Sequence, residues 1–229
     1  INTMDKEGKT FYINAEKEFD ENQKIGVIVE KVNRDSDVIR GAKAIAYENS
    51  SSYVYSQKNR DMEVEKEKVV LSYKYDNGEI DKIIDSFTAK AYIQNSKIDD
   101  TWNDKLVLRG TPQHRVSDYQ LKDEAYGFDF QFGKDLNGNQ ITWGIDFSNS
   151  ENEYLQNRTT TYLSTGAVIP DNKKRVPDSE TKRLGLYIQD EVTLGNIDFT
   201  AGLRFDSYDV SISRDDLFNN YCSVGGTMT

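Results

Sequence analysis

The chain has 229 residues, of which 36% are hydrophobic and 30% are charged, and its formal net charge is −10. Such a polar composition is typical of disordered chains when aromatic residues are few, but 14 Tyr, 10 Phe and 2 Trp indicate a folded protein. The acidic balance argues against a nucleic-acid partner, which needs a basic surface. One Cys and one His exclude a disulfide framework, multi-cysteine zinc sites and two-histidine metal motifs.

Apolar and polar residues alternate with a period of two along much of the chain, which predicts β-strands. Eight strands are expected, at residues 9–19, 23–34, 64–76, 80–96, 120–135, 139–152, 181–193 and 196–212. The fifth is the clearest, because Tyr126, Phe128, Phe130 and Phe132 alternate with Gly127, Asp129 and Gln131. Each strand therefore has one apolar face and one face of small or polar residues.

Two kinds of connection join these strands. Four are short, at residues 20–22, 76–79, 137–138 and 194–195, and two of them contain Asn-Gly, which suits tight hairpins. The other three, 35–63, 97–119 and 153–180, are long and polar, and we expect them to be loops. Outer-membrane β-barrels combine short turns at one rim with long loops at the other. The sequence thus predicts an all-β, antiparallel up-and-down transmembrane β-barrel segment of about eight strands.

A soluble β-sandwich is the alternative, because its strands also alternate between apolar and polar residues. An apolar strip gives the same sequence pattern whether it faces a dry protein core or lipid. The alternation of short and long connections favours the membrane barrel. The polar second face, with residues such as Asp129 and Asp146, also favours it, because it suits a water-filled lumen.

The stretch 177–208 carries two motifs in consecutive strands. The first is Gly185-Leu186-Tyr187-Ile188-Gln189-Asp190-Glu191, and the second, after Gly195, is Ala201-Gly202-Leu203-Arg204-Phe205-Asp206-Ser207-Tyr208. This stretch resembles the barrel of TonB-dependent outer-membrane receptors, most closely the hemoglobin, transferrin and lactoferrin receptor subfamily. Ala201 stands where that family usually has Pro.

The resemblance implies that residues 1–212 are an incomplete part of a barrel of about 22 strands, with 213–229 as an outer loop or a non-native tail. It implies TonB-dependent uptake of heme, or of iron carried by a protein or a siderophore, across the outer membrane of a Gram-negative bacterium. The heme or iron chelate is cargo and not a tightly bound cofactor. Outer-membrane lipid surrounds the barrel, and a TonB-type energy-coupling complex acts through a plug domain. The alternative is a self-contained eight-stranded outer-membrane barrel with a structural or adhesive role.

No enzymatic activity, catalytic residue or metal site is expected. His114, in a predicted loop, is the candidate for contact with heme, because an exposed imidazole binds iron; the alternative is a solvated loop histidine. A hydrolase would need His114 beside a serine such as Ser117, and no nucleophile motif accompanies them.

Two clusters of acidic residues offer carboxylate oxygens, which are the ligands that calcium prefers. They are Asp99, Asp100 and Asp104, and Glu63, Glu65 and Glu67. A solvated surface explains both clusters better than a calcium site does.

Five polar residues are expected to face the lumen of the barrel, namely Asp129, Asp146, Gln189, Arg204 and Asp206. There, Arg204 is expected to form an ion pair with nearby carboxylates.

Overall fold

The computed structural model describes residues 2–48, 51–77, 84–136 and 139–218. In these residues nine antiparallel strands form one sheet. They are β1 (Asn2–Asp20), β2 (Gln23–Glu48), β3 (Ser51–Asp76), β4 (Ser86–Leu108), β5 (Thr111–Leu136), β6 (Asn139–Tyr162), β7 (Val168–Lys173), β8 (Asp178–Leu194) and β9 (Ile197–Ser213).

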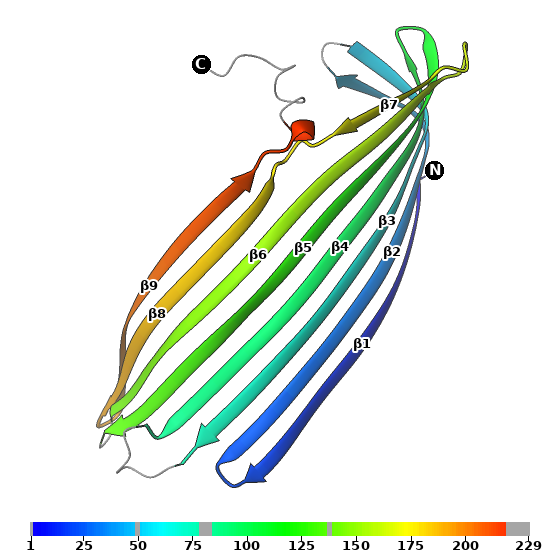
Figure 1. Ribbon diagram of the computed structural model, residues 1–229. Coiled ribbons are helices and arrows are strands. Elements are labelled where there is room, and N and C mark those ends of the chain that lie inside the picture. The colour runs from blue at the N-terminus through cyan, green and yellow to red at the C-terminus, as the bar shows by residue number, and fades with distance from the viewer. Residues whose placement is uncertain (1, 49–50, 78–83, 137–138, 219–229) are drawn as a thin grey trace, which may run out of the picture.

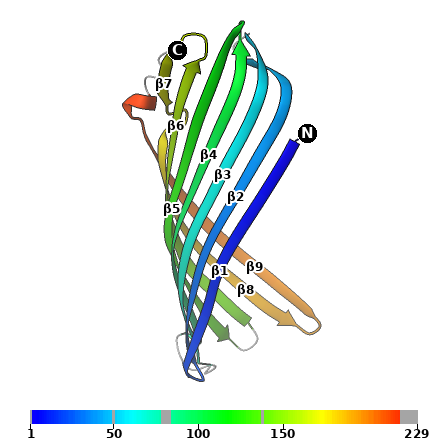
Figure 2. The ribbon, with the colours of Figure 1, turned by 90° about the vertical axis from the view of Figure 1, so that its right-hand side faces the viewer.

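Each strand lies beside the next in the chain, in the order β1-β2-β3-β4-β5-β6-β8-β9, while β7 pairs with the end of β6 (Figure 1). The predicted up-and-down antiparallel sheet is therefore confirmed. Figure 2 shows that the sheet is strongly twisted, so its edge strands β1 and β9 run in clearly different directions. No ladder joins β1 to β9 in the described residues, although a self-contained eight-stranded barrel would need one.

The strands are much longer than predicted. β2, β3 and β5 have 26 residues each, or roughly 85 Å of extended chain, whereas about 9–11 residues suffice to cross a bilayer. The expected loops 35–63, 97–119 and 153–180 are thus wrong, because most of each is strand. β4 and β5 meet in a hairpin at Arg109 and Gly110, whose φ angles of 49° and 80° suit a two-residue turn.

The remaining boundaries agree in part. The turn between β1 and β2 and the turn at Gly195 (φ 66°) are confirmed. β3 ends at Asp76 and β4 begins at Ser86, so the fourth strand starts later than predicted, and the expected turn at 76–79 falls partly in 78–83, outside the described residues. The turn residues 137–138 also lie outside them. β7 is a strand that the alternation did not predict.

The register aligns the apolar residues of neighbouring strands into one continuous band. Phe130 pairs with Ile145, Ile145 with Leu186, and Leu186 with Phe205. Aromatic rings stack along the band, with centroids 5.7 Å apart for Phe132 and Trp143 and 5.2 Å apart for Phe128 and Phe147. We call this the apolar band; it covers residues 11–15, 25–29, 69–75, 87–93, 126–132, 141–147, 184–188 and 199–205.

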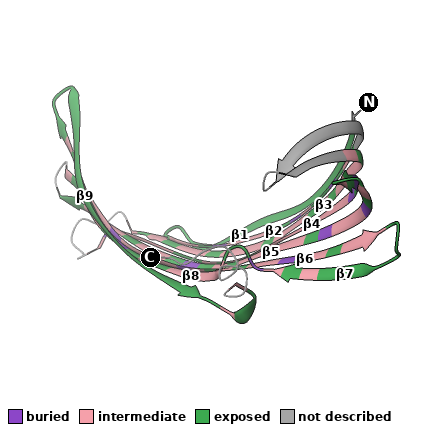
Figure 3. Ribbon diagram, turned by 90° about the horizontal axis from the view of Figure 1, so that it is seen from above, coloured by how far each residue is buried: buried purple, intermediate pink, exposed green. Residues whose placement is uncertain are grey.

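No second layer covers the apolar band, and its side chains are exposed or half-buried (Figure 3). Leu203 and Phe205, for example, are 78% and 63% exposed. Among the described residues, Val32 and Leu106 are the only buried hydrophobic side chains. A β-sandwich would instead enclose such a band in a dry core, so the architecture contradicts that alternative. In the part of the chain that the structure covers, no helix is long and apolar enough to cross a membrane.

Candidate functional site

The side of the sheet opposite the apolar band carries the charged residues expected to face the lumen. We call this side the polar face; Asp129, Asp146, Arg204 and Asp206 lie on it because they alternate with band residues. The Asp146 and Asp206 side chains are 21% and 27% exposed, and the Asp206 value is much lower than the 63% of its neighbour Phe205 in the apolar band. This difference is the one expected when side chains converge on the inner side of a curved sheet.

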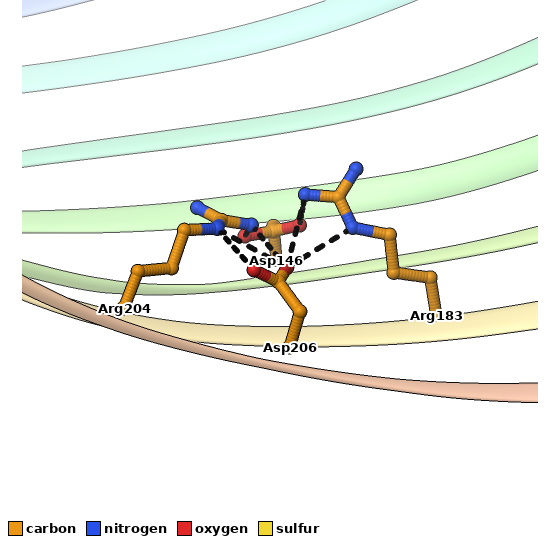
Figure 4. Close-up of polar contacts among 4 residues, drawn as sticks. All are labelled: Asp146, Arg183, Arg204 and Asp206. Atoms are coloured by element: carbon orange, nitrogen blue, oxygen red, sulfur yellow. Dashed lines mark hydrogen bonds and ion pairs between the residues drawn. The ribbon is translucent and has the colours of Figure 1, made fainter.

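An ion-pair network joins three strands on the polar face. Asp146 lies on β6, Arg183 on β8, and Arg204 and Asp206 on β9, and all four side chains point toward one another (Figure 4). Arg204 Nη2 donates to Asp146 Oδ2 at 2.6 Å, and its Nε donates to Asp206 Oδ2 at 2.9 Å. Arg183 Nη2 lies 3.3 Å from Asp146 Oδ1 and 3.2 Å from Asp206 Oδ1. The predicted ion pair of Arg204 is therefore confirmed.

Gly185 provides the space for this network. It lies on β8 directly between its pairing partners Asp146 and Asp206. A Cβ atom at this position would come within 2.9 Å of the Asp146 carboxyl carbon and closer still to the Arg204 guanidinium. The glycine that opens the 185–191 motif thus lets Arg204 reach across an entire strand to the Asp146 carboxylate.

Two other glycines of the polar face lie beneath tyrosine rings. Gly127 pairs with Tyr92, and Gly144 pairs with Tyr187. A Cβ at Gly127 would stand 2.7 Å from the Tyr92 ring, so each ring occupies the space that the glycine leaves. This alternation of small and large residues fills the interior side of small barrels.

A cleft of about 390 Å³ opens on the polar face beyond the apolar band, toward the β4–β5 hairpin. Four strands contribute its lining residues, which are Tyr55, Lys58, Asp100, Trp102, Asp104, Arg115, Ser117, Tyr119 and Arg158. The register explains this gathering, because Trp102 pairs with Ser117 and Ser117 with Arg158 in one row across the sheet. We call it the upper cleft.

Charged and aromatic groups contact one another within the upper cleft. Arg60 beside it binds Asp100 through two hydrogen bonds, from Nε to Oδ1 at 2.8 Å and from Nη2 to Oδ2 at 3.0 Å. Trp102 Nε1 also donates to Asp100 Oδ2, at 2.9 Å. Lys58 Nζ lies 4.2 Å from the Trp102 ring centroid and 5.0 Å from that of Tyr55, in cation–π geometry.

Asp104 is the most deeply placed carboxylate of the upper cleft, with 7% of its surface exposed. Its burial raises the pKa of the carboxyl above the ordinary value, although Lys58, Arg115 and Arg158 oppose this shift. Within the described residues, Oδ1 of Asp104 and Nε of Arg158 are buried without a hydrogen-bond partner. Buried polar atoms are rarely left in this state, so the cleft has unused capacity to bind a polar group.

Comparison with known proteins identifies the architecture. The family model for TonB dependent receptor-like β-barrels matches residues 11–225. The chain belongs to this family. TonB-dependent receptor barrels reside in the outer membrane of Gram-negative bacteria, and their family is one of receptors and transporters. The resemblance of residues 177–208 is thus confirmed for the family, whereas the narrower heme-receptor subfamily stays a prediction. No curated protein matches the sequence.

A solved structure shares the fold of this receptor barrel. It is BauA, the ferric preacinetobactin receptor from Acinetobacter baumannii, with 12% sequence identity and a TM-score of 0.53. The match covers 93% of this chain but 35% of BauA. The receptor-barrel chain described here therefore spans about a third of the length of that protein.

The structure of the receptor barrel places His114 differently from the sequence prediction. His114 lies within β5, not in a loop, and pairs with Lys105 on β4. It shares the face of the apolar band, opposite the upper cleft, and its Nε2 is 2.7 Å from Asn103 Oδ1. Ser117, three positions along the same strand, lies on the other face, so the two side chains do not form a catalytic pair. A contact between His114 and heme stays a prediction.

The acidic clusters of the receptor barrel are divided between two faces. Asp100 and Asp104 lie in the upper cleft, whereas Asp99 lies on the opposite face and bonds Gln120. The three glutamates of the second cluster also lie on that opposite face, where Glu67 pairs with Lys31 at 2.7 Å. Nowhere in the described ranges are three or more His, Cys, Asp or Glu side chains arranged to hold a metal ion.

Sequence reasoning missed the upper cleft because all its residues fall in stretches predicted to be loops. Asp100, Trp102, Asp104 and Leu106 share one face of the strand, and Thr101, Asn103 and Lys105 on the other face are polar as well. Because both faces are polar here, the alternation of hydropathy that marks the apolar band is absent.

Proposed function

We propose that this chain is a section of the barrel wall of a TonB-dependent receptor that imports heme, or iron carried by a protein or a siderophore. The exposed apolar band carries the proposal, because a continuous row of Phe, Leu and Ile across eight strands needs hydrocarbon around it. The family match supports the assignment to transport and not to catalysis.

The open sheet supports the proposal that the wall continues in the intact receptor. β1 and β9 are edge strands, and unpaired backbone groups within lipid are costly. Further strands of the same barrel would pair with them. The polar face would then line the lumen around the plug domain, and a TonB-type energy-coupling complex would act on that plug.

The motifs in residues 177–208 favour heme or a heme-carrying protein as the cargo. BauA, which shares the fold, is a receptor for a ferric siderophore. Both kinds of cargo deliver iron, so the proposed function is iron uptake. His114 remains the proposed heme contact of this section, although it lies on the face opposite the lumen.

A growth assay tests the proposal. The gene is deleted, and growth is measured with hemin, hemoglobin or a panel of ferric siderophores as the sole iron source. We expect growth to fail on one class of iron source and to return when the gene is restored. Undiminished growth of the deletion strain on every source, in a background without redundant receptors, would contradict iron uptake.

A further inference from the structure

We propose that the upper cleft binds a carboxylate group of the imported iron carrier. This inference rests on the proposed function and adds a ligand chemistry to it. Carboxylates are shared by the two candidate sources, because heme carries two propionates and many siderophores carry carboxylates. The experiment below distinguishes these sources.

The upper cleft lies where a ligand from outside the cell would reach it. Trp102 and Asp104 lie on β4 well beyond Ile93, where the apolar band ends on this strand. They also lie at the end where the strands run far past the apolar band, opposite the β1–β2 and β8–β9 turns, and in bacterial barrels the longer extensions are at the outer rim. A cleft of about 390 Å³ is within the usual size range of small-ligand sites. A ligand arriving from outside the cell would therefore meet this cleft first.

The charge of the upper cleft suits an anionic ligand. Arg60 neutralises Asp100 by its two hydrogen bonds. Lys58 and Arg158 remain around the single carboxylate of Asp104. The cleft is thus cationic, although the whole chain has a net charge of −10. Guanidinium groups bind carboxylates strongly because their donors match the two oxygens.

The two faces of these strands carry opposite charge. On the face opposite the upper cleft, a hollow of about 490 Å³ is lined by carboxylates. They are Asp5, Glu7, Asp35, Asp37, Asp61, Glu63 and Asp99. An anionic ligand is repelled from that face, so the cations of the upper cleft are the attractive surface of this end of the sheet.

Two buried polar atoms of the upper cleft have no hydrogen-bond partner in the described residues. Arg158 Nε is a donor without an acceptor, and Asp104 Oδ1 is an acceptor without a donor. A ligand carboxylate would accept from Arg158, and a hydroxyl or water held by that ligand would donate to Asp104. Trp102 and Tyr55, on which Lys58 rests, would form the apolar wall of the site.

The test measures equilibrium binding of three probes to the detergent-purified, full-length receptor. The probes are hemin, hemin dimethyl ester, in which both carboxylates are esterified, and ferric citrate. We expect at least one carboxylate probe to bind, and binding to weaken about tenfold or more in Arg158→Gln and in Lys58→Gln, because each loses a charge-assisted contact. Arg158→Lys, which keeps the charge, should recover part of the affinity.

Lys105→Gln is the matched control. Lys105 follows Asp104 on β4 but lies on the opposite face, so the same change of charge should leave affinity unchanged within about twofold. Heat-modifiable gel mobility checks that each variant is folded. If Arg158→Gln does not assemble, Lys58→Gln still tests whether the upper cleft binds a carboxylate. Lys58 makes no ion pair within the described part of the chain, so its loss should not disturb folding.

The binding results distinguish heme from a siderophore as the source of the carboxylate. They also distinguish a failure of this inference from a failure of the proposed function. Loss of binding by the dimethyl ester, with cleft-dependent binding of hemin, assigns the site to heme propionates. Cleft-dependent binding of ferric citrate without hemin binding assigns it to a carboxylate siderophore. Equal affinities in all variants, or no binding of any carboxylate probe, overturn the inference. The growth assay above would then still decide the proposed function independently.

Discussion

Arg204 on β9 donates to Asp146 on β6 at 2.6 Å, although β8 lies between these two strands. The contact is possible because Gly185, which pairs with both Asp146 and Asp206, has no side chain. A backbone position therefore controls an interaction between side chains on strands that are not neighbours.

Gly185→Ala should weaken the barrel by about 1–3 kcal/mol, as overpacking does elsewhere. The added Cβ would collide with the Arg204 guanidinium and the Asp146 carboxylate. Urea unfolding of the full-length receptor in detergent measures the loss. Gly8→Ala is the control, because its nearest contact would be an ordinary 3.6 Å to Arg34 Cγ. Equal stability of the two variants would contradict the role given to Gly185.

Ile145→Arg should strongly reduce the amount of folded receptor in the outer membrane. Ile145 lies in the middle of the apolar band, between Phe130 and Leu186, and an arginine facing hydrocarbon costs about 2–4 kcal/mol near the midplane. Thr142→Arg, on the polar face of the same strand, should be tolerated much better. Comparable folded amounts in quantified outer-membrane fractions would mean that the apolar band does not face lipid.

The orientation of the sheet can be tested by labelling. In a Cys222→Ser background, Arg109→Cys places a thiol in the β4–β5 turn, and Asn22→Cys places one in the β1–β2 turn at the opposite end. A membrane-impermeant maleimide should label Arg109→Cys in intact cells, and Asn22→Cys after the outer membrane is permeabilised. The reverse pattern would invert the orientation assumed for the upper cleft.

Two carboxylates should give opposite pH dependence of stability. The pKa of Asp104 is raised by burial, so the folded state holds its proton more tightly than the unfolded chain does. The stability of the wild type relative to Asp104→Asn should therefore fall as the pH rises through that raised pKa.

Asp85 should contribute a stability that changes with pH in the opposite direction. The hydrogen bonds from Lys134 and from the Asp135 backbone lower the pKa of the Asp85 carboxyl. Its contribution is present above the ordinary pKa and is lost as the pH falls through the lowered value. The stability of the wild type relative to Asp85→Asn should thus rise with pH. Urea unfolding across the acid range measures both differences, and parallel curves would contradict the assigned environments.

The predicted strands were correct where one face is apolar. The alternation of Phe128, Phe130 and Phe132 determines both the strand and its outward side, because a shift by one residue would turn every ring to the other face. The motif around Arg204 also predicted an interior ion pair. Its partner on β6 could not be predicted, because that contact depends on the register of three strands.

The prediction of loops where the structure has strands also has a physical cause. Around Trp102 and His114 both faces of the strand are polar, so the period of two leaves no mark in hydropathy. The sequence therefore predicts a loop for these residues, although each pairs with a residue of a neighbouring strand. The upper cleft was missed for the same reason, since its residues meet only across the hydrogen-bonded rows of β3 to β6.

The length of the strands has a consequence for recognition at the cell surface. Flexible loops must lose conformational freedom when they close around a ligand, and that loss reduces affinity. In the proposed receptor the surface beyond the apolar band is a continuation of the hydrogen-bonded sheet, already fixed by pairs such as Asp104 with Arg115. A cargo molecule would thus dock onto a preorganised wall, with little entropic penalty for ordering the protein.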